Sequence, residues 1–579
     1  PPPRPLLFPP PPPLPPPPSP PSPTTSPPPP PPPNILLLLL DDLGYSSLLS
    51  SPTPSLSSLS SRGVLFSNAH ASLANCAPSR SSLLSGLRPD THRCYDLHTP
   101  FRDTLPHAIT LPQAFRLSGY LTLSFGKVFH QRLDDEPSWS SEADLAGLVR
   151  LDFPRRRGNT EWAAEWRYNQ YHTAAAAARR AELRANGAAK AHGVNWGMPL
   201  WERGPETDPH GRRYTDYTLA SRTIRAIGRL ARQPRPWFVA TGFVRPHLPW
   251  NAPARHFELA AAHAARLAEA ACDAACRPPA GVSAEYAAHL QDGFGELRTF
   301  GVRAAQLRPG SARAAELALA HAAAVSFADA QVGRVLRDGL EAHNLTRRTI
   351  VVVLGDHGFK LGHGGGWGKH GLSRVDTQVP LVFAGPGVPS GVRVATPVEL
   401  IDVYPTLLRL ARLQPPVSTG QPPLEGRSLH ELMHRGLTVA TAEGVVERGL
   451  AARRGGSLAN GDEEEGCAIS QWPRYNKSGC MGYAVRSAGW SLVEWVPFHR
   501  RRASAGLPTA PHDAPCERSA DLFHDGVRAS GLSEARSILH DERAKALDMH
   551  RLLLVALGRS KWGRAGAPRL PKTPVWAES

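Results

Sequence analysis

Two pairs of neighbouring polar residues carry side chains that bind divalent cations. Asp41 and Asp42 follow one apolar run of the chain, and Asp356 and His357 follow another. Carboxylate oxygens are hard ligands: Ca²⁺ accepts several of them in a flexible geometry, whereas Mg²⁺ demands a tighter octahedron. On its own, the first pair would be interpreted as a helix N-cap. Taken together, the two pairs predict a metal site.

A segment around Cys76 has the composition of a helix start that could hold an anion. The sequence Cys-Ala-Pro-Ser-Arg occupies residues 76–80, and Leu-Leu-Ser-Gly follows at 83–86. Pro78 fits the first turn of a helix, where its missing N–H costs nothing. Residue 76 would then lie at the helix N-terminus, where free N–H groups and the helix dipole favour an anion. The alternative is an ordinary buried cysteine in front of a helix.

Four short apolar runs have the length and composition of buried parallel strands. They occupy residues 35–40, 121–125, 237–241 and 349–354. Between them lie helical patterns, at 111–118, 218–232 and 314–340. Such alternation predicts an α/β fold, with a large, mostly parallel sheet sandwiched by helices.

The residues after these strands predict a single site. In an open α/β sheet, ligands bind outside the carboxyl ends of the strands. The second strand leads to Gly-Lys-Val-Phe-His at 126–130, and the third leads to Arg-Pro-His-Leu-Pro at 245–249. The four strand ends therefore bring carboxylates, histidines and a lysine to one edge of the sheet, namely Asp41, Asp42, Asp356, His130, His247, His357 and Lys127.

Composition divides the chain of 579 residues into three parts. Residues 1–33 are almost entirely proline with a few Ser, Thr and Leu, which predicts a disordered polyproline II segment without a core. The main domain is expected over 34–435, with variable insertions at about 131–215 and 251–310. A smaller C-terminal subdomain, with a small antiparallel sheet and a helix, is expected over 436–579.

The formal net charge of +16 comes mostly from arginine and attracts polyanions over long distances. Nucleic acid is not the expected partner, because the sequence has no zinc-finger spacing, no RNA-binding aromatic signature and no long basic helix. A sulfated polysaccharide would suit the same charge. The alternative is that a GC-rich genome enriches arginine without function. We expect no membrane span, because an apolar run such as 35–40 is far too short.

The cysteines and sequons are typical of a secreted or lumenal glycoprotein. Sequons begin at Asn344 and Asn476. Because the chain starts at Pro1 rather than Met, we expect its true N-terminus and any signal peptide to be missing. We therefore expect a protein of the secretory pathway, either extracellular or in a lysosome or vacuole. Apart from Cys76, an even number of cysteines remains for disulfides: Cys94, Cys272, Cys276, Cys467, Cys480 and Cys516.

These motifs resemble those of the type I sulfatases of the alkaline phosphatase superfamily, and among them most closely those of the iduronate 2-sulfatases. The pattern Cys-x-Pro-Ser-Arg-x-x-Leu-Leu-Ser-Gly is the one in which these enzymes oxidise the cysteine to formylglycine. Most sulfatases have Asn in place of His357. The likeness runs from about residue 34 to about 525 and implies the alkaline-phosphatase-like sulfatase fold. Further matching segments are 88–91, 126–130, 245–249, 325–329, 356–358, 470–474 and 481–483.

The resemblance implies a sulfuric ester hydrolase that acts on a sulfated polysaccharide or oligosaccharide, specifically on a 2-O-sulfated uronate. Formylglycine, made from Cys76 by the formylglycine-generating enzyme, would be the nucleophile. Its aldehyde hydrate has two geminal hydroxyls, one to attack sulfur and one to expel sulfate. Arg80 would stabilise this hydrate. One Ca²⁺ would be bound by Asp41, Asp42, Cys76, Asp356 and His357. The sulfate and the leaving oxygen would be surrounded by Lys127, His130, His247 and Lys369.

Some positions depart from the family and leave the substrate open. The loop 43–47 is short, Leu-Gly-His-Gly-Gly stands at 361–365 instead of Leu-Gly-Glu-His-Gly, and Phe359 replaces a tryptophan. The alternatives are an aryl or other carbohydrate sulfatase, and a phosphonate or phosphate monoester hydrolase with the same motif. A non-enzymatic alternative is a cell-surface glycoprotein with a decayed hydrolase domain. Such decay usually removes a ligand or the cysteine, and the chain retains all of them.

Overall fold

The computed structural model of the protein divides the chain into two units, Pro1–Pro32 and Pro33–Ser579. The predicted polyproline segment lies almost entirely outside the described residues, and the fold below is that of the second unit. The structure describes residues 31–131, 133–141, 143–145, 171–187, 197–263, 279–417, 420–435, 440–441, 444–445, 466–474, 479–487, 489–498, 516, 518–524, 537–558 and 574.

An eight-stranded sheet forms the centre of this unit. The strands β7, β1, β5 and β3 are parallel, while β10 runs antiparallel to both of its neighbours, β7 and β2. All four predicted strands are present and adjacent, which confirms the predicted mostly parallel α/β sheet. In spatial order the strands are β11 (Val392–Val394), β2 (Gly63–His70), β10 (Gln378–Ala384), β7 (Thr349–Gly355), β1 (Asn34–Leu40), β5 (Trp237–Phe243) and β3 (Leu121–Gly126), with β12 (Val398–Glu399) also paired to β2.

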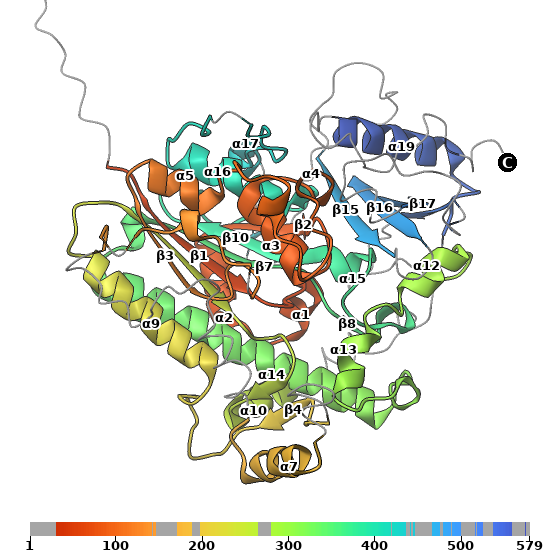
Figure 1. Ribbon diagram of the computed structural model, residues 1–579, viewed down its shortest axis with the longest axis horizontal. Helices are drawn as coiled ribbons and strands as arrows, with labels where there is room; N and C mark the ends of the chain where they lie inside the picture. Colours follow the sequence, from red (N-terminus) through yellow and green to blue (C-terminus); the bar gives the residue numbers. More distant parts are fainter. Residues whose placement is uncertain are drawn as a thin grey trace, which may run out of the picture. The chain divides into compact units, whose positions relative to one another are not determined.

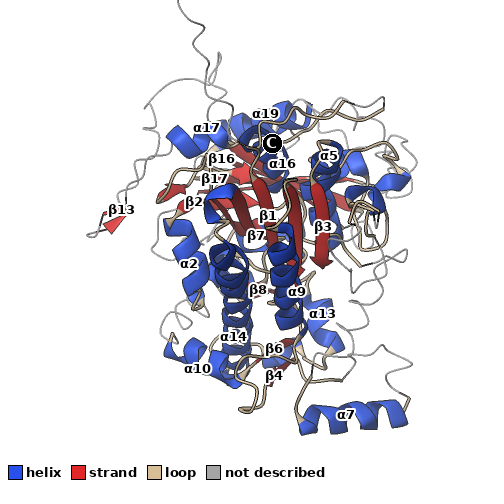
Figure 2. Ribbon diagram, turned by 90° about the vertical axis from the view of Figure 1, so that its left-hand side faces the viewer, coloured by secondary structure: helices blue, strands red, loops and turns tan. Residues whose placement is uncertain are grey.

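Helices cover both faces of the sheet (Figures 1 and 2). Strand β1 is therefore apolar at every position from Ile35 to Leu40, since both faces of a strand between two helical layers are buried. Leu37 and Leu39 pack in the core that includes α3, α5 and α16, whereas Leu38 and Leu40 pack in the core with α2, α9 and α14. These helices are α2 (Pro54–Ser61), α3 (Cys76–Ser85), α5 (Leu111–Leu117), α9 (Thr215–Leu230), α14 (Ala312–Arg334) and α16 (Val403–Leu410).

A second, antiparallel sheet lies in the C-terminal part of the chain and carries helix α19 (Arg543–Gly558) against it. Asp90, in the short helix α4 (Pro89–His92), links this sheet to the helices beside the first one. Its carboxylate accepts hydrogen bonds from Tyr483 Oη at 2.7 Å and from Gln471 Nε2 at 2.9 Å. The predicted boundary at residue 435 stays a prediction. The strands of the second sheet are β15 (Cys467–Pro473), β16 (Cys480–Ser487), β17 (Trp490–Pro497) and β18 (Ser519–His524).

Shorter elements surround the two sheets. The helices are α1 (Tyr45–Ser50), α7 (Ala174–Ala185), α10 (Ala254–Ala262), α12 (Ala284–His289), α13 (Phe294–Thr299), α15 (Arg374–Thr377) and α17 (His430–Arg435). The strands are β4 (Trp201–Arg203), β6 (Trp250–Ala252), β8 (Lys360–Leu361), β9 (Trp367–Gly368), β13 (Ala440–Thr441) and β14 (Gly444–Val445). Among the helices that the structure describes, none is both long and apolar enough to cross a membrane.

The predicted disulfides are confirmed for one pair, Cys480 and Cys516. Cys94 and Cys467 are free thiols, so the six cysteines do not all pair in the way an even number would allow. The remaining two, at 272 and 276, lie outside the described residues.

Candidate active site

The register of two neighbouring strands brings the two predicted ligand pairs together. Leu40, the last residue of β1, is paired in parallel with Gly355, the last residue of β7. Asp42 therefore lies beside Asp356, and its backbone N–H donates to Asp356 Oδ1 at 3.0 Å. The φ of Asp42 is 67°, a left-handed conformation that is uncommon outside glycine and that clusters at functional sites.

Helix α3 places Cys76 at this edge of the sheet, and it begins at Cys76 as predicted. The Sγ atom lies 3.3 Å from His357 Nε2 and 3.4 Å from Lys369 Nζ. Ser79, in the first turn, donates from Oγ to the backbone oxygen of Asp356 at 2.5 Å. Because every residue of α3 is buried, the helix holds Cys76 in a fixed position.

A group of possible metal ligands is formed by Asp41, Asp42, Cys76 and His357, whose ligand atoms all lie within 4.8 Å of one another. Asp42 Oδ2 is buried and, among the described residues, has no hydrogen-bond partner. Buried carboxylate oxygens normally have a partner, so this atom fits one that binds a cation. Asp356 lies next to the group, and its Oδ2 is 3.6 Å from His357 Nε2. The oxygen-rich donor set suits a hard divalent ion.

Three buried cations surround these carboxylates. Arg80 donates from Nη2 to Asp41 Oδ1 at 3.2 Å and from Nε to Asp356 Oδ2 at 2.9 Å. Lys127 Nζ donates to Asp41 Oδ2, and Lys369 Nζ donates to Asp42 Oδ1 at 2.9 Å. These pairs fix positive charges around Cys76, where they act in a site with little water.

Burial and charge oppose each other in setting the pKa of these groups. Burial raises the pKa of Asp41, but Lys127, His247 and Arg80 outweigh it and hold that pKa well below its usual range. Burial lowers the pKa of Lys369, but the negative charges of Asp42, Cys76 and Glu296 hold that pKa well above its usual range. Asp41 and Lys369 are therefore both charged at neutral pH.

The three histidines differ in their surroundings. Burial lowers the pKa of His357, but Asp356 and Cys76 attract a proton and raise that pKa to about 10. Burial, reinforced by the charge of Lys127, lowers the pKa of His130 to about 2, so His130 is neutral. His247 Nδ1 lies 2.7 Å from the backbone oxygen of Leu248, and its Nε2 is 4.0 Å from Glu296 Oε1.

Glu296 is the residue of this site that the sequence did not reveal. It lies on α13, inside the predicted insertion 251–310, and its Oε1 is 3.3 Å from Lys369 Nζ. Burial raises its pKa, but Lys369 and His247 outweigh burial and bring the pKa to about 2. The sequence has one hint nearby, the glycine at position 293. A side chain there would clash, because an added Cβ would lie 1.9 Å from the backbone oxygen of Lys369.

Two features correct or extend the expectations about substrate contacts. Phe359, which replaces the family's tryptophan, is fully buried and packs edge to face with Trp250 at a centroid distance of 5.6 Å. It therefore belongs to the core rather than to the surface of the site.

His370, the residue after Lys369, stacks on Trp472 of β15 at a centroid distance of 5.1 Å. The second sheet thus reaches the edge of the site.

The sequence profile of the sulfatase family matches residues 33–413. The chain therefore belongs to the sulfatase family, a family of sulfuric ester hydrolases. It is 28% identical to a sulfatase of Formosa agariphila, over 62% of this chain and 65% of that protein. It is also 28% identical to the iduronate 2-sulfatase of Homo sapiens, over 77% of this chain and 81% of that protein. Both matches confirm the resemblance.

Solved structures share the fold. A phosphonate monoester hydrolase from Silicibacter pomeroyi superposes with a TM-score of 0.59 at 20% identity, over 92% of this chain and 96% of that one. A 2-O GAG sulfatase superposes with a TM-score of 0.53 at 19% identity, over 92% of this chain and 93% of that one. These neighbours confirm the predicted alkaline-phosphatase-like fold.

Proposed function

We propose that the protein removes the sulfate of a sulfated carbohydrate, and specifically of a 2-O-sulfated uronate. The observation that carries this proposal is the position of Cys76 Sγ, which lies within 3.4 Å of both His357 and Lys369 and belongs to a group of possible metal ligands. Two of the similar proteins bear the names iduronate 2-sulfatase and 2-O GAG sulfatase, which supports the specific substrate.

Two groups complete the proposed site. Ca²⁺ held by Asp41, Asp42, Asp356, His357 and residue 76 would stabilise negative charge as a Lewis acid. Formylglycine at residue 76, made by the formylglycine-generating enzyme, would supply the hydroxyl nucleophile that a thiol lacks. The disulfide of Cys480 and the exposed sequon at Asn344 support a glycoprotein of the secretory pathway.

The cations of the chain then act on the sulfate. A sulfate monoester resists hydrolysis because its anionic oxygens repel a nucleophile. Lys127 and Lys369 are buried and held by Asp41 and Asp42, so they need little reorganisation to offset charge that develops in the transition state. Arg80, fixed by two carboxylates, would stabilise the formylglycine hydrate at residue 76.

The leaving alkoxide needs a proton, and the geometry favours His247 as its donor. His130 is neutral, because its pKa is about 2, so it can accept a hydrogen bond but cannot serve as the acid. His247 faces Glu296 across 4.0 Å, and this carboxylate would help to orient the ring toward the leaving oxygen.

A second candidate function is hydrolysis of phosphonate or phosphate monoesters. The observation that raises this candidate is the shared fold of a phosphonate monoester hydrolase, with a TM-score of 0.59, a value that a structure bound to D-glucosamine-2-N,6-O-disulfate equals. Hydrolysis rates for an aryl sulfate and the matched aryl phosphonate decide between the two reactions, and a faster phosphonate reaction would overturn the sulfatase proposal.

The proposed function is tested in two steps. Tryptic mass spectrometry of active protein should find an aldehyde at residue 76, and Cys76→Ala should fold normally without turnover. An active preparation containing only the thiol would refute the proposed nucleophile. Sulfate release is then compared for 2-sulfated iduronate, 6-sulfated hexosamine and an aryl sulfate at one ionic strength. Preference for either of the last two would refute the uronate but leave the sulfatase reaction standing.

A further inference from the structure

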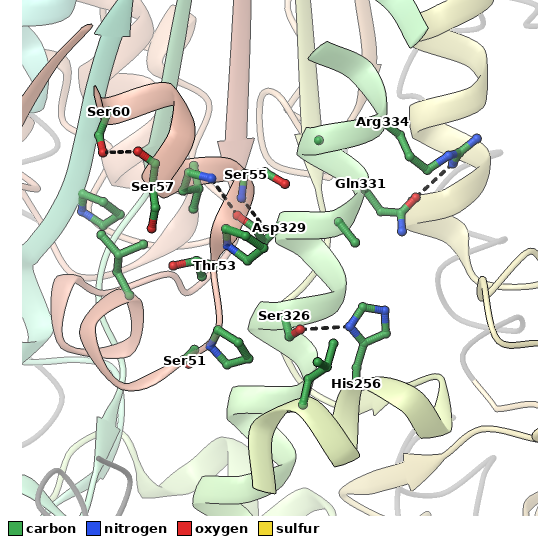
Figure 3. Close-up of a pocket in the computed structure, with 18 of the residues that line it drawn as sticks. Ser51, Thr53, Ser55, Ser57, Ser60, His256, Ser326, Asp329, Gln331 and Arg334 are labelled. Carbon is green, nitrogen blue, oxygen red and sulfur yellow. Dashed lines mark hydrogen bonds between the residues drawn. The ribbon is translucent and has the colours of Figure 1, made fainter. Parts of the chain in front are cut away.

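A cavity of about 1070 Å³ opens between α1, α2, α10 and α14 (Figure 3). Among the described residues, those that line it include none of the candidate active site. Its volume is at the upper end of that of small-molecule sites, which are about 300–1,000 Å³. The space is therefore large enough for more than one sugar ring.

The charge of this cavity is strongly positive. Of the described lining residues, the positively charged ones are all arginines, and Asp329 is the one carboxylate. Asp329 is already engaged, because its two oxygens accept the N–H groups of Ser55 at 2.9 Å and Leu56 at 2.8 Å at the start of α2. The arginines are Arg212, Arg255, Arg334, Arg337 and Arg393.

The cationic groups lie close enough to affect one another. Burial lowers the pKa of Arg334, Tyr217 and Asp338 oppose this effect, and the nearby charges of Arg337 and Arg212 add to it. Arg337 has a partner in Asp338 at 2.9 Å on the surface. Arg393 Nη2 donates to Tyr45 Oη at 2.9 Å, while its buried Nε has no partner among the described residues. An anion in the cavity would relieve this repulsion.

The rest of the lining suits a carbohydrate. Hydroxyl side chains follow one another along α2 and the segment before it, and Ser51 Oγ is buried without a partner in the described part of the chain. Exposed apolar side chains, Leu49 and Leu259, lie among the polar ones. A sugar chain presents hydroxyls at its edges and C–H groups on its faces, so both kinds of lining have a counterpart in it.

We propose that this cavity is a binding site for a sulfated oligosaccharide segment, separate from the ester that is hydrolysed. The arginines would pair with sulfate groups, the serine and threonine hydroxyls would bond to sugar hydroxyls, and the leucines would contact the ring faces. This inference goes beyond the proposed function, because binding here does not depend on which ester is cleaved. A polymeric substrate held in this cavity would be retained between successive cleavages.

The test measures binding of a fluorescent heparin-derived octasaccharide to the full chain by anisotropy. The variant Arg212→Ala/Arg255→Ala removes two exposed cavity arginines, and Arg225→Ala/Arg308→Ala removes two exposed arginines elsewhere. We expect the dissociation constant to rise about tenfold in the first variant, since two exposed charge pairs contribute about that much, and by less than about twofold in the second. Thermal unfolding should be unchanged in both.

Three further measurements decide the interpretation. Lys369→Met, which alters the candidate active site, should bind the octasaccharide as the parent does, and a loss of binding there would assign the octasaccharide to that site. The fully desulfated octasaccharide should bind far more weakly, and equal binding would overturn the role of sulfate. Tighter binding of a single-stranded oligonucleotide of equal charge would overturn the carbohydrate. None of these results depends on turnover, so a failure of the proposed sulfatase reaction would be seen separately.

Discussion

Lys369→Met is the change that most directly tests how the site stabilises charge. Lys369 is fully buried, and its Nζ lies 3.4 Å from Cys76 Sγ, the position that the proposed nucleophile would occupy. Its pKa is held well above the usual range, mainly by Asp42, Cys76 and Glu296 acting against burial. The ammonium is therefore charged throughout the range in which the enzyme could work, and methionine replaces it with a neutral chain of similar length.

The size of the effect follows from the distance. A full unit charge at 3.4 Å interacts with the ammonium by about 5 kcal/mol at an effective dielectric constant of about 20. If roughly half a charge develops in the transition state, the loss is about 2.5 kcal/mol, or about 70-fold in kcat. Because Lys369 stays charged, we expect the same factor at every pH between 5 and 8.

The assay is steady-state hydrolysis of an aryl sulfate, with the metal content of each preparation measured by mass spectrometry. Lys360→Met is the matched control, because Lys360 is equally buried in the neighbouring strand β8 but pairs with Asp376, and it contacts Lys369 only through a long, 3.4 Å hydrogen bond to the backbone oxygen. Its removal leaves a buried carboxylate uncompensated, which costs about 3–5 kcal/mol of stability. We expect Lys360→Met to unfold more easily yet to retain the kcat of its folded fraction.

The reasoning fails if Lys369→Met, folded and loaded with metal, keeps its kcat within about threefold of the parent. It also fails if the fall in kcat varies with pH, because a group that titrates in the assay range would then be responsible for that fall. A fall in metal content that matches the fall in kcat would assign Lys369 a role in metal binding instead.

Three other predictions concern the carboxylates. Asp42→Asn should lower bound Ca²⁺ per chain at fixed free Ca²⁺, measured after dialysis, because it removes a carboxylate of the proposed ligand set; full occupancy would contradict this assignment. Glu296→Gln should lower kcat about tenfold at unchanged KM, because Lys369 and His247 lose the charge that positions them; a change in KM alone would refute it. Burial raises the pKa of Asp329 to about 6. The native state thus keeps a proton that the unfolded chain releases, and stability should fall as pH rises from about 4 to 6. Asp329→Asn should reduce the change of unfolding free energy between about pH 4 and 6, measured by urea unfolding. An unchanged pH dependence would mean that another group causes it.

Much of the central sheet could be predicted from the sequence because its middle strands are buried on both faces. A run such as Ile35–Leu40 has no other place to fold than between two helical layers. Strands β2 and β10 were not predicted, for identifiable reasons. Strand β2 carries Ser67 and Asn68 among its apolar residues, and β10 contains Pro380 at an irregularity in its pairing with β2. Proline in a strand is normally confined to edges or bulges, so the pattern argued against a strand.

The candidate site was predictable where it depends on strand ends and not where it depends on packing between distant segments. Asp42 and Asp356 meet because parallel strands end at one edge of the sheet. Glu296 reaches Lys369 only because α13 packs against the loop after β9, a contact that leaves no periodic signal in the sequence. The burial of Phe359 likewise follows from its neighbours Trp250 and His321, which come from other parts of the chain.

The burial of α3 limits the time available for the proposed oxidation of Cys76 to formylglycine. The residues that enclose Cys76 are distant in the sequence: His357 is 281 positions away and Lys369 is 293. A ribosome adds about 5–20 residues per second, so roughly 15–60 s separate the synthesis of Cys76 from that of these two residues. During this interval the thiol is accessible, and afterwards folding encloses it. The active fraction of molecules would therefore depend on whether modification or folding is faster during synthesis. Any change that delays the pairing of β7 with β1 should raise that fraction.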